Sequence, residues 1–421
     1  MKRFCSLLVI FVLFSLSVWA GGDRQSGGSA GGVTTIRFYG SDGAYNQNIV
    51  KGFEASNPDI KVEIVPIDFD NAEQVIKTGI ASGNPVDVSF FWGTNINTFV
   101  DNNMAYDFTP DLNANNNAWR NTFVPKYLEG GKVGNGIYAI SYQPVIETLY
   151  YNKDLFSANG LQVPVTWDDF LKVCETFKSK GIYGMSNWVG QNHQLLVFAY
   201  QEMANKGVLE DATAGKLPFA GTNEAPGLRK ALTMLKDAYD KGYWYPGQGA
   251  LTATKDQVQA AFYQQRTAML FDAGSNVGTY QTEAPFNVGV MKFPIIDSNS
   301  KYGVNVVTNA LFIPSNAKHK AEAVRFIKYY TSDAGMAEIV KSGRLPSTVS
   351  MQPKIENKLM QDLLFTTEGN NVVSYTHLQN LSPEISTYIG DMVGMVCSGT
   401  SIDNVLTRLE NLRQTTIRAR R

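Results

Sequence analysis

Two adjacent carboxylates, Asp168 and Asp169, are the most obvious candidates for acid–base chemistry in this sequence. A pair of acids can hydrolyse a glycosidic bond, one as general acid and the other as base or nucleophile. Neighbours on a helix point about 100° apart, however, so these two would not face one substrate. They follow Thr166, a good helix N-cap, and acids in a first turn complement the helix dipole. The pattern therefore favours a capping motif.

Other catalytic patterns fail on their context. Residues 27–31 (GGSAG) match the G-x-S-x-G nucleophile elbow, but a Gly/Ser spacer supplies neither the strand nor the helix that the elbow requires. Residues 134–139 (GNGIYA) match a dinucleotide-binding G-x-G-x-x-A, but strand-like sequence follows where a helix should begin. The chain has no P-loop, H-E-x-x-H or C-x-x-C motif. Its 3 histidines are far apart, so we expect no metal and no cofactor.

The composition is that of a globular chain with two domains. It has 421 residues, 44% of them hydrophobic, and a domain typically takes about 100–200 residues. Lys and Arg number 37 against 38 Asp and Glu, so no charge excess favours a nucleic-acid partner. With 3 cysteines a disulfide scaffold is excluded. Cys174 and Cys397 lie in apolar stretches, and the sequence leaves open whether they are buried thiols or a disulfide.

The N-terminus has the pattern of a secretory signal peptide. Lys2 and Arg3 precede an apolar run over 4–18, and small residues follow, so we expect residues 1–20 to be removed after Ala20. The run is shorter than the about 20 residues of a membrane span. The only nearby cysteine, Cys5, precedes the run, so no lipid anchor is expected. Residues 21–32 resemble a flexible Gly/Ser linker. We expect a soluble, monomeric protein that is periplasmic or secreted.

Strand-like and helical segments alternate from residue 33 onward. Residues 33–39, 60–67 and 86–92 are β-branched and aromatic, and residues 45–56 and 72–82 have helical spacing. This alternation predicts an α/β fold with a largely parallel sheet. Further strands are expected at 136–139, 148–151, 268–271, 288–293 and 310–314, and helices from 164 and at 195–203, 228–241, 255–264, 318–331, 334–341 and 402–421. No linker separates two halves, which suggests interleaved domains.

The sheet topology itself predicts where a ligand would bind. In open α/β sheets, ligands lie beyond the carboxyl ends of the strands. That rule places residues 40–45 and 92–97 beside one crevice.

Five spaced stretches of the chain resemble one known family. They are residues 53–62 (FEASNPDIKV), 80–88 (IASGNPVDV), 149–156 (LYYNKDLF) with its continuation to 170, 267–275 (TAMLFDAGS), and 313–346 with Ile313-Pro314 and Gly343-Arg344-Leu345-Pro346. Together these resemble the extracellular solute-binding proteins, family 1, of ABC importers.

The resemblance implies a two-lobed periplasmic-binding-protein fold of type II. Each lobe is then a central, mostly parallel sheet flanked by helices, and the chain crosses a three-strand hinge near residues 141–145, 289–294 and 330–335. Lobe one comprises 33–142 plus 295–333, and lobe two comprises 143–294 plus 334–421.

The resemblance also places candidate ligand residues, of the types that suit a sugar. Flat aromatic rings cover a sugar's CH face, and fixed polar groups match its hydroxyls. Those expected from lobe one and the hinge are Ser41, Asp42, Tyr45, Trp92, Asn95, Tyr142, Glu147 and Asn309, and Arg344, before Leu345-Pro346, is expected to join them. Those expected from lobe two are Asn187, Trp188, Trp244, Tyr245, Asp272, Gly274 and Ser275. Maltose-binding members of the family stack a Trp near Ser275, so Trp244 and Tyr245 are expected to replace it.

The resemblance implies a binding protein and no enzyme. It would capture a sugar by hinge closure and deliver it to a membrane permease. A non-sugar solute, either a polyamine or a glycerol phosphodiester, is the alternative within this class. The alternative outside it is a secreted carbohydrate-active enzyme using Asp42, Asp87 or Asp272, although the sequence shows no carboxylate pair at a defined separation.

Overall fold

The structure is a computed structural model that describes residues 32–67, 71–188, 194–213, 216–221, 227–301, 303–368, 372–374 and 382–419. The predicted signal peptide, and all of the predicted linker except residue 32, lie outside these ranges. No helix in the described ranges is long and apolar enough to cross a membrane.

The first five elements follow the predicted alternation. They are β1 (Thr34–Gly40), α1 (Ala44–Ser56), β2 (Ile60–Pro66), α2 (Ala72–Ala81) and β3 (Val88–Trp92). Strand β1 pairs in parallel with both β2 and β3. Because neighbouring parallel strands end at the same edge of a sheet, the loops after β1 and β3 lie next to each other.

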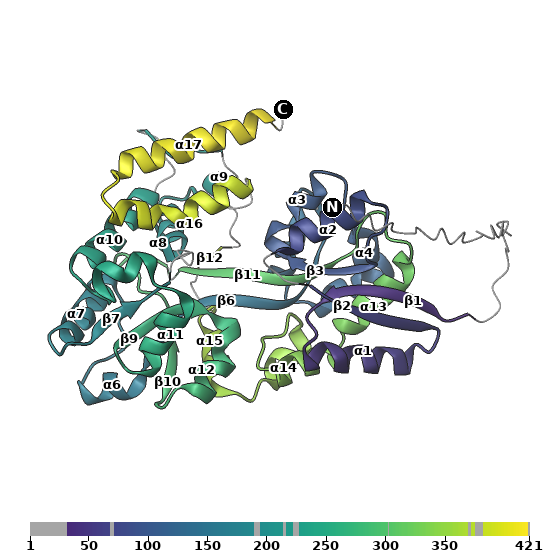
Figure 1. Ribbon diagram of the computed structural model, residues 1–421, viewed down its shortest axis with the longest axis horizontal. Helices are drawn as coiled ribbons and strands as arrows, with labels where there is room; N and C mark the ends of the chain where they lie inside the picture. Colours follow the sequence, from purple (N-terminus) through teal and green to yellow (C-terminus); the bar gives the residue numbers. More distant parts are fainter. Residues whose placement is uncertain are drawn as a thin grey trace, which may run out of the picture.

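One sheet continues through both halves of the molecule, in the order β2-β1-β3-β11-β6-β9-β7-β8. Its second half contains β7 (Tyr183–Ser186), β8 (Trp244–Tyr245) and β9 (Thr267–Ala273), which again pair in parallel. Between the halves run two long strands, β6 (Ile140–Asn152) and β11 (Gly303–Phe312), antiparallel to each other (Figure 1). Strand β10 (Val288–Met291) pairs with β6, and β12 (Val372–Ser374) pairs with β11. The predicted two-lobed α/β fold is confirmed.

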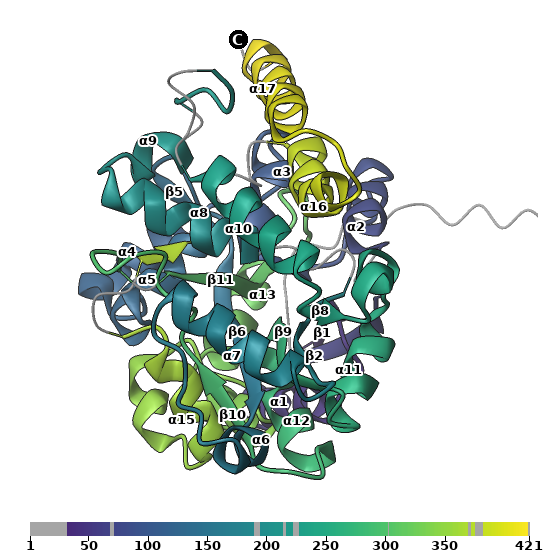
Figure 2. The same cartoon turned by 90° about the vertical axis from the view of Figure 1, so that its left-hand side faces the viewer.

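Helices cover both halves of this sheet. In lobe two, α8, α10, α16 and α17 contact one another in series, as seen from the side in Figure 2. The remaining helices are α3 (Asn97–Val100), α4 (Thr109–Asn117), α5 (Pro125–Leu128), α6 (Lys153–Ala158), α7 (Trp167–Lys178), α8 (Gln194–Asn205), α9 (Leu209–Thr213), α10 (Leu228–Asp240), α11 (Lys255–Tyr263), α12 (Val277–Glu283), α13 (Lys320–Tyr330), α14 (Asp333–Lys341), α15 (Lys358–Phe365), α16 (Pro383–Cys397) and α17 (Ile402–Ala419). The described chain also contains the short 3-10 turns η2 (Gly93–Asn95), η6 (Gly274–Asn276) and η7 (Val349–Lys354). A small hairpin is formed by β4 (Lys132–Val133) and β5 (Gly136–Ile137).

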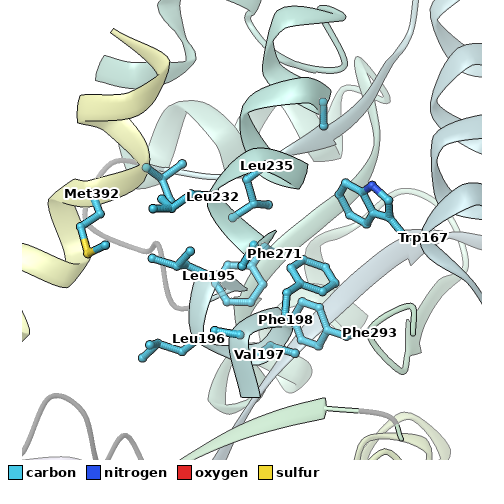
Figure 3. Packing of buried hydrophobic residues seen from close by; sticks show 14 of the residues in the cluster. Trp167, Leu195, Leu196, Val197, Phe198, Leu232, Leu235, Phe271, Phe293 and Met392 are labelled. Carbon is cyan, nitrogen blue, oxygen red and sulfur yellow. The ribbon is translucent and has the colours of Figure 1, made fainter. Parts of the chain in front are cut away.

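Each lobe has its own apolar core. In lobe two, α8 is buried on nearly all sides, and its Leu195 and Phe198 pack against Phe271 of β9 and Trp167 of α7 (Figure 3). Helix α7 begins with a capping box, in which Asp169 N donates to Thr166 Oγ1 at 3.2 Å and Thr166 N donates to Asp169 Oδ2 at 3.3 Å. Asp169 is therefore a capping residue, as predicted, and Asp168 accompanies it in the first turn.

The packing suggests different hinge positions from the predicted ones. Helix α14 contacts α1, and its Met336 and Ile339 belong to the core of lobe one, whereas residues 334–421 were assigned to lobe two. Pro294 O accepts from Gln201 of α8 at 3.0 Å, so the chain is still on lobe two after residue 294. Of the predicted crossings, only 141–145 lies in a strand that joins the halves. We propose that the second crossing is β11 and that the third follows η7.

The two cysteines of the described chain are free thiols. Cys174 is buried against Gly184 of β7. Burial raises the pKa of the Cys397 thiol to about 12, so it is protonated at neutral pH. The structure thus answers the question that the sequence left open, and it favours thiols.

Candidate ligand-binding site

The candidate site in lobe one lies at the carboxyl ends of β1 and β3. Ser41, Asp42 and Tyr45 follow β1, while Trp92 ends β3 and Asn95 lies in η2. Asp42 is exposed, and the other four side chains are half-buried. This is the sheet edge at which the strand-end rule placed residues 40–45 and 92–97.

A hydrogen-bond network fixes the loop after β1. The Tyr45 hydroxyl lies 3.0 Å from Ser41 Oγ, and Asn46 Nδ2 donates to Ser41 O at 2.8 Å and to Ser41 Oγ at 3.0 Å. The Tyr330 hydroxyl of α13 donates to Asn46 Oδ1 at 2.6 Å. Since Asn46 is only 2% exposed, these bonds are shielded from water and hold Tyr45 in one place.

Tyr142 and Arg344 complete the group around Tyr45. The Tyr142 and Tyr330 rings pack edge to face, with centroids 5.1 Å apart. The Arg344 guanidinium carbon lies 4.6 Å from the centre of the Tyr45 ring, and Arg344 NH1 donates to Ser342 O at 3.2 Å. Burial raises the pKa of the Tyr142 and Tyr330 phenols well above the ordinary value, while the Arg344 charge acts in the opposite direction. Both phenols therefore remain protonated at neutral pH.

A third element of lobe one is an amide pair on the hinge strands. Asn309 of β11 stands opposite Trp92 of β3 on one side and Gln143 of β6 on the other. Asn309 Nδ2 donates to Gln143 Oε1 at 3.1 Å. The β6–β11 register shifts at Asn309/Ala310, and a bulge of this kind re-aims side chains. The pair therefore sets the direction of the Asn309 amide beside the Trp92 ring.

In lobe two, Asn187 and Trp188 follow the end of β7, and Gly274 and Ser275 follow β9. Trp188 is half-buried, and its Nε1 donor is shielded but finds no acceptor within the described part of the chain. Gly274 is required by close packing, because a Cβ there would lie 2.5 Å from Ile146 O. Ser275 is half-buried.

The two predicted acids Asp272 and Glu147 are engaged within the protein. Asp272 is 2% exposed and accepts hydrogen bonds from Tyr280 at 2.6 Å, Asn276 at 2.7 Å and Gln259 at 3.3 Å. Glu147 is 3% exposed and accepts from Asn305 Nδ2 of β11 at 2.9 Å. These contacts stabilise the β9–α12 junction and the hinge strands, so we leave both acids out of the proposed contact set.

The expected replacement for the missing tryptophan platform is also buried. Trp244 is 3% exposed in the lobe-two core and packs edge to face on Tyr239. Tyr245 is 9% exposed and lies between Tyr183 and the Arg266 guanidinium. We therefore propose no ligand contact for Trp244. For Tyr245 we propose at most a contact through the edge of its ring.

Three positioning residues were not predicted from the sequence. They are Asn46, Gln143 and Tyr330, all buried. Asn46 is a polar residue in a helical stripe otherwise formed by Ile49 and Phe53, and Gln143 interrupts an apolar strand. A buried polar residue in an apolar pattern must find hydrogen bonds, and that signal could have identified both.

Within the described ranges, no group of three or more His, Cys, Asp or Glu side chains could hold a metal ion. Asp87, considered above as a catalytic acid, accepts backbone N–H bonds from Arg37 and His319, each at 3.0 Å. It thus joins β1 to the segment before α13.

Two α/β lobes joined by shared strands, with aromatic and polar side chains at the strand ends of both, form the architecture of the type II periplasmic binding proteins. The chain belongs to the bacterial extracellular solute-binding protein family, whose model matches residues 39–337.

Individual relatives agree with this assignment. The chain is 26% identical over 331 residues to a multiple sugar-binding protein of Streptococcus mutans, covering 75% of each chain. Its fold is similar to that of the sugar-binding protein MalE of Xanthomonas citri, with a TM-score of 0.76, 20% identity and coverage of 92% of this chain and 98% of the other. It is also similar to an ABC substrate-binding protein of Listeria monocytogenes solved with cycloalternan, with a TM-score of 0.72, 20% identity and coverage of 91% and 99%.

Proposed function

We propose that this solute-binding protein captures a sugar or oligosaccharide between its lobes and delivers it to the membrane permease of an ABC importer. The observation that carries the proposal is the placement of half-buried aromatic rings at the strand ends of both lobes. Tyr45 and Trp92 stand in lobe one and Trp188 in lobe two. Such rings suit the CH face of a sugar, and the neighbouring amides and hydroxyls suit its rim.

Ligand contacts from both lobes would favour a closed state. A ligand shifts a conformational equilibrium only by its difference in affinity for the two states, and only a closed form lets both lobes contact one sugar. Strands β6 and β11 connect the lobes, so they are the elements about which we propose the lobes move.

The described acids support binding rather than hydrolysis. A glycosidase needs two carboxyl groups about 5–10 Å apart, facing one substrate. Asp87 and Asp272 are each occupied by structural hydrogen bonds, and Asp42 is exposed and accepts from Gln47. A polyamine would likewise need several available acids at the site. The proposed contact set offers one, Asp42.

A binding screen tests the proposal. The chain from residue 21 onward would be titrated calorimetrically with mono- to tetrasaccharides, with polyamines and glycerol phosphodiesters as competing classes. A ligand at a hundredfold excess over Kd should add about 2.7 kcal/mol to the free energy of unfolding. We expect a saccharide to bind, to be recovered unaltered after a day, and to reduce the radius of gyration in solution scattering. Binding of a polyamine alone, or cleavage of the sugar, would contradict the proposal.

The sequence of the export segment leads to a separate proposal on location. We propose that residues 1–20 are a signal peptide and that the mature, monomeric protein begins at Gly21 in the periplasm or outside the cell. Intact-mass analysis of exported material should give a chain starting at Gly21 without a lipid adduct. A retained Lys2-Arg3 would refute this.

A further inference from the structure

Arg344 carries a positive charge that no acid balances within the described part of the chain. Within the described residues its side chain donates a hydrogen bond from Nη1 to the backbone oxygen of Ser342, and its guanidinium lies over the ring of Tyr45. Arg325 offers a contrast, because it pairs with both carboxylate oxygens of Asp59 at 2.7 and 3.1 Å. Most N–H donors of Arg344 are therefore unused at the candidate site.

The acids that could have neutralised Arg344 are engaged elsewhere. Glu338, on the preceding helix α14, pairs with Lys341 at 2.6 Å and accepts from Asn48 at 2.9 Å. Asp42 accepts from Gln47 at 2.8 Å. Glu147 and Asp272 are bound to Asn305 and to Tyr280, as described above. Each of these carboxylates is thus engaged with a partner other than Arg344.

The groups that do face Arg344 are neutral. Tyr45 lies beneath the guanidinium, and the phenols of Tyr142 and Tyr330 are close enough for the Arg344 charge to act on them. Because both phenols are buried and protonated, they cannot supply a negative charge. A half-buried guanidinium whose neighbours are neutral suits an anionic partner, and a ligand at this position can supply that anion.

We propose that the ligand is an acidic saccharide, in which the carboxylate of a uronic acid pairs with Arg344. This inference rests on the proposed sugar-binding function and narrows it. A guanidinium is a planar fork that matches a carboxylate with two parallel hydrogen bonds. Tyr45 and Trp92 supply aromatic faces at the same strand ends, so one uronic-acid residue could meet both a cation and a ring.

Matched sugars test this inference. Each pair differs only at C6, where one member has a carboxylate and the other a hydroxymethyl group: glucuronate and glucose, galacturonate and galactose, mannuronate and mannose, as free sugars and as di- and trisaccharides. Calorimetric Kd values would be measured for the wild-type chain and for Arg344→Gln, Arg344→Lys and Arg325→Gln. Arg325→Gln is the control, because it also removes a guanidinium from lobe one but at the opposite, amino-terminal end of the strands.

We expect at least one acidic member to bind tenfold or more tightly than its neutral partner. Arg344→Gln should abolish that preference, Arg344→Lys should keep part of it, and Arg325→Gln should leave it unchanged. The acidic sugar should also bind more weakly as salt concentration rises. Melting temperatures within a few degrees of the wild type would show that the variants fold.

Two results would overturn the inference, and they are distinguishable. If neutral sugars bind as tightly as acidic ones, or if the preference persists in Arg344→Gln, the acidic-saccharide inference fails and the sugar-binding function stands. If no saccharide binds while a glycerol phosphodiester does, both proposals fail, because the anion that Arg344 pairs with is then a phosphate of a different solute class.

Discussion

Tyr45 of lobe one and Asp272 of lobe two both stand near the carboxyl end of a strand, but their side chains are used differently. Tyr45 is held by Ser41 and lies beneath Arg344, and it remains half-exposed. Asp272 is enclosed by Tyr280, Asn276 and Gln259, and nothing of its carboxylate is left for a ligand. Similar positions in the topology thus leave a side chain accessible in one lobe and use it for internal support in the other.

This difference suggests that the two lobes contribute unequally to ligand binding. In lobe one, the Asn46 network and the Gln143–Asn309 pair fix polar groups before any ligand arrives, which lowers the entropy cost of binding. In lobe two, the described candidates that remain are Asn187, Trp188 and Ser275. We therefore expect lobe one to select the ligand and lobe two to close over it.

The largest effect is expected for Asp272→Ala. The substitution leaves the buried hydroxyl of Tyr280 and the amides of Asn276 and Gln259 without their acceptor. The free energy of unfolding should fall by about 3–5 kcal/mol, as for other broken buried charge networks. Chemical denaturation would measure it, with Asp42→Ala as the control because Asp42 is exposed. If the free energy of unfolding falls by the same small amount in both variants, Asp272 does not stabilise the fold.

A second test compares the aromatic rings of the two lobes. Trp92→Ala should weaken ligand binding by about 2–3 kcal/mol, as a hot-spot ring does, while Trp188→Ala should cost about 1 kcal/mol. Trp244→Phe, which changes a core ring, should alter stability and leave affinity nearly unchanged. Calorimetry and melting temperatures together separate these outcomes. A larger affinity loss for Trp188 would reverse the proposed division between the lobes.

Asn46→Ala should reduce both stability and affinity. It removes the partner of Tyr330 and of Ser41, and a buried group left unpaired costs about 1–2 kcal/mol. Because Tyr45 would then be free to move, the affinity should fall as well, although Asn46 has no predicted ligand contact. Lys51→Ala, at an exposed site on the same helix, is the matched control. An unchanged affinity would show that the network is not needed for recognition.

The smallest effect concerns pH and lies within lobe two. Burial acts to raise the pKa of Glu410, but hydrogen bonds from Arg413, Phe219 N and Gln414 together outweigh it and lower this pKa below its ordinary value. A depressed folded-state pKa stabilises the protein above the unfolded value, about 4.3, and this contribution is lost as the pH falls through the folded value. Glu410→Gln should therefore cost about 1 kcal/mol at pH 7. Chemical denaturation at a series of pH values would measure this cost. At acidic pH the free energies of unfolding of Glu410→Gln and of the wild type should become equal.

The sequence predicted the local elements of lobe one closely, because their patterns are decided by nearby residues. Strand β1 and helix α1 of lobe one, like the Thr166–Asp169 capping box of lobe two, need only alternation, spacing and a capping residue. The long strand β6 was predicted only as a short piece, 148–151. Its remaining residues are buried by contacts with β11 and β9, which lie far away in the chain. Helix α15 was not predicted, and α16 was predicted only as an apolar helical stretch around Cys397.

The candidate site likewise has features that the sequence predicted and features that depend on distant packing. The strand-end rule located Tyr45 and Trp92 correctly at one sheet edge, since the rule depends on topology alone. It could not show that Asp272 faces inward or that Trp244 is buried, because those orientations depend on Gln259, Tyr280 and Tyr239 packing against them. It also gave no reason to select Tyr330, which comes from a helix almost 300 residues after its partner Asn46.

The continuous sheet also bears on how the protein is made. Trp92 of β3 pairs with Asn309 of β11. The β3 edge of the sheet formed by the first three strands therefore stays unpaired until a strand roughly 200 residues later in the chain has been made. Ribosomes add about 5–20 residues per second, which makes that wait about 10–40 s. Neither lobe is complete when β11 emerges, because α13 and α14 of lobe one and α15, α16 and α17 of lobe two all follow β11 in the chain. Strand β11 then has to enter the sheet between β3 and β6, two strands that were made earlier.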